Sequence, residues 1–433
     1  MSSSTSSIAT VVQQYADVAA VLWLRRDRAV RQPHYTLPDL AKLDSQLEAH
    51  IDGLRIAGNL GWEVAAEGLR WKEPGELFTA GVLAWESRDT SRARTAIGCA
   101  AESAECARAL VSSLGWLNAE MAAPHIEQLL GNSSVLSQHL GIAACVAHGH
   151  VPGDALEKAL SVRDSSLHAR ALRAIGELGR HDLLPAAREA LRSSNAQARC
   201  ASAWTLARLC NEPLAIVALQ EAVERQGPNQ LLALPIVLRR LDPAEATCWL
   251  TRLAQNSKSI EQAIVGAGVV GTCDAVPWLL EIMSDPRWSR IAAEAFTMIT
   301  GIDLATARFE GRKPAGFTAG PTDDPADDNV EMDPDENLSW PDAPRLAVWW
   351  EKHSGEFVAG KRYLCGRPLD EQWLEEVLRD GFQRQRAAAA LELGLLRPDR
   401  PLFNVRAPGH RQQEWLESRQ VSPERVNSDF RTR

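Results

Sequence analysis

The sequence predicts an all-α protein in which helix pairs stack on one another, and the pattern in residues 167–191 is the first observation behind that prediction. A helix there carries Leu172, Ile175 and Leu178 on one face, because apolar residues three and four apart share a side of an α-helix. Gly179 ends this helix, a polar turn follows, and a second apolar helix completes the pair. Since one pair cannot bury its apolar face alone, neighbouring pairs must stack against it.

The same pattern recurs along the chain, which is the second observation. The positions equivalent to Ile175 are Leu114, Val146 and Leu206, and their spacings are 32, 29 and 31 residues. The partner helices end in step with them, at spacings of 30, 31 and 32 residues. Helix pairs that repeat at this period are the signature of an α-solenoid. We therefore expect a solenoid over residues 74–310.

Residues 1–73 are predicted to form an atypical helical cap before the repeats, because the terminal repeats of solenoids differ from the interior ones. A Ser-rich start leads into a helix that ends near Val30. Thr36 then has the features of an N-cap residue, with Asp39 three positions later, so a second helix is expected to begin there. The Leu and Ile residues of this helix fall on one stripe, which predicts that it packs against its neighbours.

Residues 311–339 differ in composition from the rest and are predicted to be an acidic, Pro-rich linker. Eight Asp or Glu residues lie between Asp323 and Glu336. A segment this polar cannot bury enough apolar surface to fold by itself. Its carboxylates could hold a cation, although their spacing differs from that of a calcium-binding loop. Alternatively, they could pack on arginines of the C-terminal region, and the sequence leaves both alternatives open.

The C-terminal region, residues 340–433, is predicted to be a helical module rich in Trp and Arg. Arg384 and Arg386 lie near the start of a predicted helix, where the helix dipole disfavours cations, so we expect acidic partners for them, with residues 323–336 as one candidate. On a helix they point about 200° apart, so one can pair internally while the other faces a partner. Trp and Arg often carry the binding energy of protein interfaces, although the tryptophans could instead pack the module's own core. The candidate protein-binding residues are Trp349, Trp350, Arg384, Arg386 and Arg411.

The composition argues against several classes of protein. A formal net charge of -9 over 433 residues disfavours a general binder of nucleic acid. No apolar run is long enough to span a bilayer, and the start of the chain lacks the basic residues and unbroken apolar core of a signal peptide. The eight cysteines are scattered without a Cys-x-x-Cys pair, as expected for small buried thiols in a reducing compartment. These observations predict a cytoplasmic protein without a membrane span.

The sequence motifs do not assemble into a catalytic, metal-binding or cofactor-binding site. His139, His148 and His150 are close in sequence, but no further ligand has matching spacing, so we interpret them as surface or capping residues. Residues 266–271 match a Gly-x-Gly-x-x-Gly fingerprint in letters only, because they lie in a predicted helical repeat with no preceding strand. Neither a Gly-x-Ser-x-Gly elbow nor a Walker A motif occurs. We therefore expect no cofactor and no catalysis.

The repeat pattern resembles the HEAT-like repeats of bacterial proteins, in which an Ala-rich helix ending in Leu-Gly precedes an Ala-Val-Pro-x-Leu helix. Leu178 with Gly179 and residues 275–279 match this pattern, whereas Cys210 stands where Gly is usual. The resemblance is specific for fold and nearly silent on function. Some HEAT-like proteins are alkylbase DNA glycosylases and others are bilin lyases, so the resemblance implies these two enzyme classes as alternatives.

Several sequence blocks resemble a narrower group, a family of uncharacterised bacterial HEAT-repeat proteins. Residues 22–55, 291–304, 363–369 and 403–412 are among these blocks, and they occur in the same order. This resemblance spans nearly the whole chain and implies an association with bacterial type VI secretion. We therefore expect a non-catalytic scaffold or adaptor with a protein partner, and no nucleic-acid partner.

Overall fold

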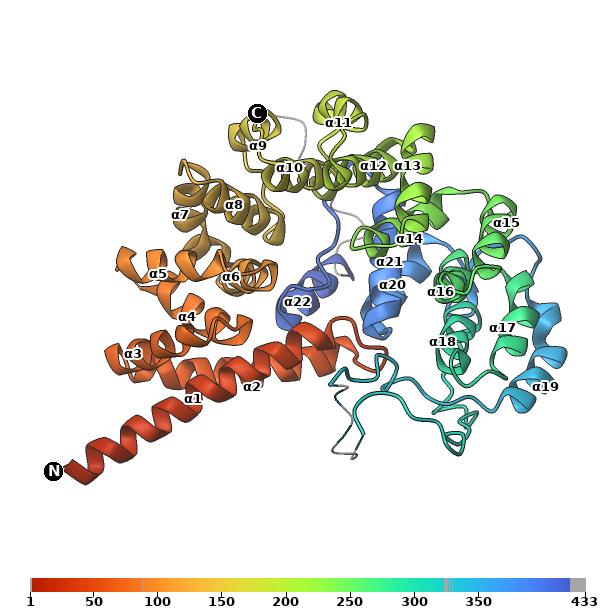
Figure 1. Cartoon of the computed structure of the whole chain (residues 1–433), viewed down its shortest axis with the longest axis horizontal. Helices are drawn as coiled ribbons and strands as arrows, with labels where there is room; N and C mark the ends of the chain where they lie inside the picture. Colours follow the sequence, from red (N-terminus) through yellow and green to blue (C-terminus); the bar gives the residue numbers. More distant parts are fainter. Residues whose placement is uncertain (1, 88, 323–325, 327, 329, 421–433) are drawn as a thin grey trace. The chain divides into compact units, whose positions relative to one another are not determined.

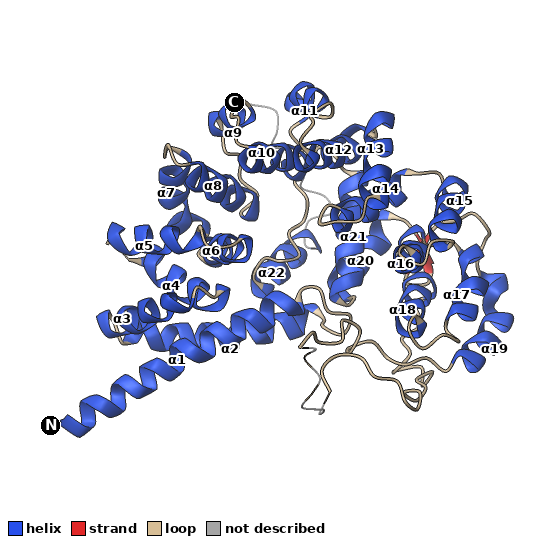
Figure 2. Cartoon of the chain, viewed as in Figure 1, coloured by secondary structure: helices blue, strands red, loops and turns tan. Residues whose placement is uncertain are grey.

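The computed structural model describes residues 2–87, 89–322, 326, 328 and 330–420. Over these residues the protein is all-α, as predicted, and consistent with stacked helical repeats: Figures 1 and 2 show helices α1–α22 and one small hairpin of β1 (Tyr363–Leu364) and β2 (Arg367–Pro368). Contacts divide the chain into two units. The first unit comprises the residues up to Arg31, Tyr35–Thr205 and the residues from Pro398 onward, and the second comprises Gln32–His34 and Leu206–Arg397.

The first unit is built from helix pairs. Its inner row is formed by α4, α6, α8 and α10, each of which contacts the next, and α5, α7 and α9 pack outside them (Figure 1). Leu172, Ile175 and Leu178 are buried between the rows, which confirms the apolar face predicted for α10. The helices are α1 (Ser2–Ala29), α2 (Leu37–Ile56), α3 (Asn59–Gly68), α4 (Pro74–Glu86), α5 (Thr90–Ala100), α6 (Ala104–Trp116), α7 (Ala119–Leu130), α8 (Val135–Ala147), α9 (Asp154–Leu160), α10 (Ser165–Leu178), α11 (Leu184–Ala190), α12 (Ala196–Cys210, shared with the second unit) and α22 (Gly409–Gln420).

The helix ends follow the local sequence. Thr36 and Asp39 form a capping box at the start of α2, because each side chain accepts a hydrogen bond from the other residue's backbone N–H. Gly179 ends α10 in the left-handed conformation, with a φ of 73°. The equivalent residue after α12 is Asn211, with a φ of 50°, and not Cys210. Asn is one of the few residues other than Gly that tolerates this conformation, so the repeat can end without a glycine.

The second unit continues the helix pairs and adds the hairpin. In this unit α16 packs against both α14 and α18, and α20 packs against α21. The helices are α13 (Pro213–Glu224), α14 (Gln230–Arg240), α15 (Pro243–Ala254), α16 (Ile260–Val270), α17 (Val276–Ile282), α18 (Ser289–Thr300), α19 (Ala343–His353), α20 (Glu371–Asp380) and α21 (Gln383–Leu396). Short 3-10 turns lie at Leu69–Trp71, His181–Leu183, Cys273–Ala275 and Ser354–Glu356.

The acidic segment is partly folded against the second unit. Of its residues, 323–325, 327 and 329 lie outside the described part of the chain. Asp333 accepts a hydrogen bond of 2.8 Å from Arg290 of α18, whose side chain is almost fully buried. The Arg290 guanidinium also lies 4.7 Å from the centre of the Trp340 ring. This part of the segment is therefore held by an arginine of the repeats.

The boundaries of the two units differ from the predicted domains. The predicted solenoid, residues 74–310, contains the division between them inside α12, and the predicted C-terminal module, residues 340–433, is divided at Arg397. The reason is that residues after Arg397 make their contacts with the first unit, as described below. None of the described helices is both long and apolar enough to cross a membrane.

Candidate functional site

The inner helices of the first unit, together with the segment that follows Arg397, line an open cavity of about 800 Å³. Small residues such as Ala107 of α6 and Ala143 of α8 line it, and leave room that larger side chains would fill. Apolar walls come from Val111 and Leu136. Charged groups also line it, so the cavity combines apolar surface with several guanidinium groups, a combination that suits a ligand with both apolar and anionic parts.

The first group of charges comes from one face of α10. Arg170, Arg173 and Glu177 are three, four and seven positions apart, so all three point to the same side of the helix. Both arginines pair with the Glu177 carboxylate, and Arg173 Nε donates to Glu177 Oε1 at 3.0 Å. Burial alone would raise the pKa of Glu177, but the charges of the two arginines outweigh it and hold that pKa below its usual value. The group therefore carries one positive charge in excess.

Arg173 is held in place by an aromatic ring. Its guanidinium carbon lies 3.2 Å from the centre of the Trp204 ring, and Trp204 is itself buried. Burial lowers the pKa of Arg173, and Glu177 opposes that shift, so the side chain remains a cation at neutral pH. Stacking on one face and pairing along one edge fix the orientation of the guanidinium at the cavity wall.

Two donors of this group are not satisfied. Arg170 Nε and Arg173 Nη1 are buried and have no hydrogen-bond partner among the described residues. A buried donor without a partner costs about 1–3 kcal/mol, so such groups are uncommon unless they serve a purpose. Both arginines line the cavity, and 17% and 19% of their side-chain surfaces remain exposed.

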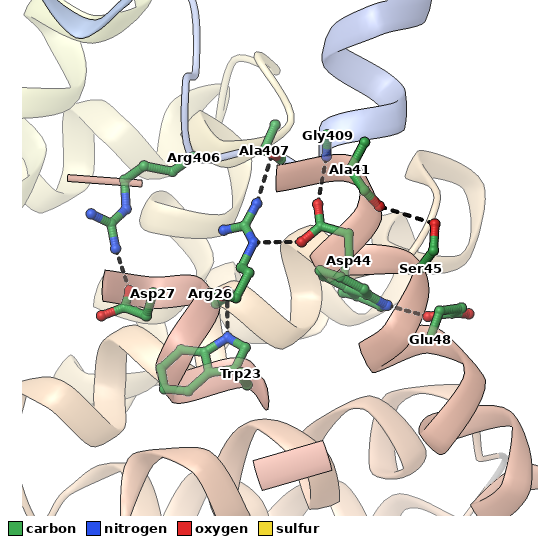
Figure 3. A network of polar contacts seen from close by, with 12 residues as sticks. Trp23, Arg26, Asp27, Ala41, Asp44, Ser45, Glu48, Arg406, Ala407 and Gly409 are labelled. Carbon is green, nitrogen blue, oxygen red and sulfur yellow. Dashed lines mark hydrogen bonds and ion pairs between the residues drawn. The ribbon is translucent and has the colours of Figure 1, made fainter. Parts of the chain in front are cut away.

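A second group of charges surrounds Asp27 of α1 and comes from separate parts of the chain. Arg108 of α6 and Arg406 both pair with Asp27 of α1, and Figure 3 shows the contact between Asp27 and Arg406. Burial raises the pKa of Asp27, but the hydrogen bond from Arg108 and the charge of Arg406 outweigh this and lower it overall. Burial lowers the pKa of Arg406 to about 10, which leaves it charged at neutral pH. Arg31 also pairs with Asp27, so three arginines share this carboxylate.

Residues 398–412, here called the C-terminal segment, contact the C-terminal ends of three inner helices. The last carbonyl groups of a helix have no partner within it, and they accept readily from other donors. Arg411 also places a cation where the dipole of α6 favours one. The hydrogen bonds are those of Leu402 N to Glu177 O of α10 (2.7 Å), Asn404 Nδ2 to Ala147 O of α8 (3.2 Å) and Arg411 Nη1 to Gly115 O of α6 (2.8 Å).

A buried ion pair anchors the same segment on the helices α1 and α2. Arg26 Nε lies 2.9 Å from Asp44 Oδ1, and the side chains of both residues are 3% exposed. Figure 3 shows how the pair is used: Arg26 donates to the carbonyl of Ala407 at 2.8 Å, and Asp44 accepts from the backbone N–H of Gly409 at 2.6 Å. A Cβ atom on Gly409 would lie 2.7 Å from backbone atoms of Ala41, so only glycine allows this close approach.

The histidines differ in their surroundings. Burial and the nearby charge of Arg170 lower the pKa of His139 to about 4, so its ring is neutral at neutral pH. The rings of His148 and His150 are 6.1 Å apart, and His148 Nε2 lies 3.0 Å from the carbonyl oxygen of Leu114. In the described part of the chain, no three His, Cys, Asp or Glu side chains are placed to hold a metal ion.

The predicted interface tryptophans are half-buried residues of α19 in the second unit. Trp349 stacks on His353 with 4.5 Å between ring centres and meets the edge of Phe296. Trp350 lies 5.3 Å from Phe357. Both rings therefore contribute to packing within the second unit, which is the alternative role that the sequence left open.

The predicted interface arginines of α21 are held internally in the second unit. Arg384 pairs with Glu294 of α18, an acidic residue that lies outside the candidate range of 323–336. Arg386 is fully buried; it donates to the carbonyl of Leu378 at 2.7 Å and to Gln383 at 2.9 Å. A partner cannot contact Arg386 there, so its proposed place at an interface is wrong. Arg411, the fifth candidate, belongs to the first unit and contacts α6.

Sequence reasoning missed the residues that line the cavity. Arg170, Arg173 and Glu177 do form a stripe at helical spacing, and that stripe was a usable signal. The pairing of Asp27 with Arg406 spans 379 residues, and nothing in the local sequence announces it.

Residues 153–234 match a family model described as HEAT repeats. The match includes α10 with its two arginines, as well as Trp204, and it covers a shorter part of the chain than the predicted solenoid. No curated protein and no solved structure matches the chain. The region of HEAT repeats is therefore the feature that this chain shares with known proteins.

Proposed function

We propose that this protein is a non-catalytic adaptor that binds a protein partner in the cavity of the first unit. HEAT repeats in general form scaffolds for protein interaction, and they present surfaces on their inner helices. The observation that carries the proposal is the cavity of about 800 Å³ on these helices, lined by five arginines among apolar residues. Arginine and tryptophan are the side chains that most often contribute large binding energies at protein interfaces.

The chemistry of the cavity supports a binding role over a catalytic one. The candidate catalytic base and nucleophile of the cavity are His139 and Ser166, with 3.5 Å between His139 Nδ1 and Ser166 Oγ. A general base works best when its pKa is near the working pH, and the pKa of His139 is about 4. The adjacent charge of Arg170 further opposes protonation of that ring. The pair is therefore a poor acid–base device at neutral pH.

A second part of the proposal concerns the cellular system to which the protein partner belongs. The resemblance noted in the sequence leads us to propose that the adaptor serves a bacterial type VI secretion system in the cytoplasm. Its test is independent of the cavity, because it asks which proteins co-purify with the full chain. Components of the secretion apparatus among them support this assignment, whereas DNA-repair or phycobiliprotein partners favour one of the enzyme alternatives.

The cavity itself can be tested by filling it. Ala107 lines the cavity from α6, whereas Ala119 is exposed at the start of α7. Ala107→Phe places an aromatic ring in the cavity, and Ala119→Phe adds the same ring outside it. We expect proteins captured by the wild type to be lost with Ala107→Phe and kept with Ala119→Phe, in pull-downs quantified by mass spectrometry. Equal capture by all three proteins would contradict the proposed site.

A further inference from the structure

We propose that Arg170 and Arg173 bind a carboxylate of an acidic partner peptide. The inference rests on the proposed function, and it names the chemistry that the cavity recognises. The first observation is the pair of buried donors, Arg170 Nε and Arg173 Nη1, that have no hydrogen-bond partner among the described residues. A guanidinium group offers two parallel N–H donors at the spacing of carboxylate oxygens, so it binds a carboxylate in a planar, bidentate manner.

The second observation is that the site is already ordered. Arg173 stacks on the buried ring of Trp204 and pairs with Glu177, and Arg170 pairs with the same carboxylate. Binding a ligand therefore immobilises few additional side chains, and a preorganised site has a lower entropic cost of binding. An arginine that was merely exposed would lack this advantage.

The third observation is the balance of charge. Glu177 neutralises one of the two arginines, which leaves a single positive charge to be met by a single carboxylate. His139, on the neighbouring wall, is neutral and adds none. Asp164 also lines the cavity, but its carboxylate accepts from the backbone N–H groups of Ser166 and Leu167 at the start of α10. It is therefore engaged with the dipole of that helix.

The ligand is a peptide because residues 402–408 of this chain, which lie outside helices and strands, already form part of the cavity wall. Leu402 of the C-terminal segment donates its backbone N–H to the carbonyl of Glu177, beside the two arginines. The second charge group, in which Asp27 is shared by Arg31, Arg108 and Arg406, also has positive charge in excess. Arg108 and Arg406 line the cavity, whereas the side chain of Arg31 is mostly exposed. A peptide with two acidic residues and apolar side chains between them satisfies both groups and the apolar walls of the cavity.

The test selects peptides from a random 12-residue library displayed on phage, using the full-length protein as bait. We expect enriched peptides to be rich in Asp and Glu beside apolar residues. Replacing the acidic residues by their amides in an enriched, fluorescently labelled peptide should weaken binding by about ten- to a hundredfold, because hydrogen bonds to charged groups are lost.

Variants with opposite expected effects separate recognition from folding. Arg173→Met should weaken binding of the acidic peptide about ten- to a hundredfold, and Arg173→Lys should recover only part of it, because Lys lacks the planar fork. Glu177→Gln removes the internal competitor and should tighten binding. The control is Arg163→Met, which removes the same charge from an exposed position outside the cavity. A purely structural role predicts weaker binding in Arg173→Met and in Glu177→Gln alike.

Three results would overturn the inference in distinguishable ways. If enriched peptides are blocked by Ala107→Phe but are not acidic, or are insensitive to Arg173→Met, the adaptor function stands and the carboxylate site is wrong. If free glutarate displaces the labelled peptide at concentrations near the peptide's own Kd, the cavity binds small dicarboxylates and not a peptide. If Ala107→Phe leaves all peptide and protein binding intact, the proposed function itself is wrong.

Discussion

The buried ion pair between Arg26 and Asp44 makes the attachment of the C-terminal segment testable by a single change, Asp44→Asn. The substitution keeps the size of the side chain and removes its charge. Arg26 then stays buried with the carbonyl of Ala407 as its remaining contact in this network, and the N–H of Gly409 faces an uncharged amide. We therefore expect the C-terminal segment to detach more often from α1 and α2.

The contacts in the structure set the size of this effect. Two hydrogen bonds to a charged carboxylate are lost, each worth about 1.5–3 kcal/mol, and the Asn oxygen can restore about 1 kcal/mol as a neutral acceptor. Removing one partner of a buried ion pair independently suggests about 3–5 kcal/mol, because the other charge is left buried. Together the two lines of reasoning predict that the opening free energy of the C-terminal segment falls by about 2–5 kcal/mol.

Hydrogen exchange measures that opening directly, by mass spectrometry of peptides that cover residues 402–412. Asp52→Asn is the matched control, since Asp52 is an acidic residue of the same helix whose side chain is 58% exposed. Exposed ion pairs contribute at most about 1 kcal/mol, so this variant should exchange like the wild type. Gly409→Ala should also release the segment, by a steric route. Equal exchange in Asp44→Asn and Asp52→Asn would refute the role given to the ion pair.

The remaining predictions concern pH, the repeat core and nucleic acid. The pKa of His139 is lowered to about 4, whereas in the unfolded chain it is near 6.5, so the unfolded state takes up the proton first as the pH falls. The free energy of unfolding should therefore decrease between about pH 6.5 and pH 4, by about 2 kcal/mol at pH 5. In urea unfolding, the His139→Gln variant should show a smaller decrease than the wild type. An identical pH dependence of the two proteins would contradict this. Leu178→Asp places an unpaired charge in the core of α10 and should cost several kcal/mol, so an unchanged melting temperature would show that the wrong face was assigned. The net charge of -9 predicts no binding to duplex DNA at physiological salt, and a salt-dependent gel shift at sub-micromolar protein would overturn this.

Features that depend on a few neighbouring residues were predictable from the sequence. The capping box of Thr36 and Asp39 and the left-handed Gly179 are set by backbone groups within one turn of a helix. The burial of Leu172 and Ile175 follows from helical periodicity. The left-handed residue that follows α12 is Asn211 and not Cys210, the position equivalent to Gly179 in repeats of equal length. The reason is that α12 ends one residue later than α10 does in its own repeat.

Features that depend on distant residues were not predictable in this way. Gly409 approaches Ala41 across most of the chain, and a sequence gives no sign that a glycine is required for such a contact. Arg386 was named as an interface candidate because arginine often carries binding energy at protein interfaces, but here a carbonyl and an amide inside the second unit receive its N–H groups. The boundary at Arg397 has the same origin, because the residues that follow it fold back on the first unit.

The two charge groups of the cavity show where this limit lies. Arg170, Arg173 and Glu177 share a stripe about 100–200° away from the core stripe of α10, so the sequence identifies them as a charged face, but it cannot tell open solvent from a cavity. In the second group, the contact of Asp27 with Arg406 exists only when the C-terminal segment is docked, because Arg406 is part of that segment. Asp44→Asn therefore weakens the docking of Arg406 together with the segment and leaves the first group intact, whereas Arg173→Met removes a member of the first group and leaves the segment docked. Comparing acidic-peptide binding by these two variants separates the contribution of a single helix from that of the folded unit.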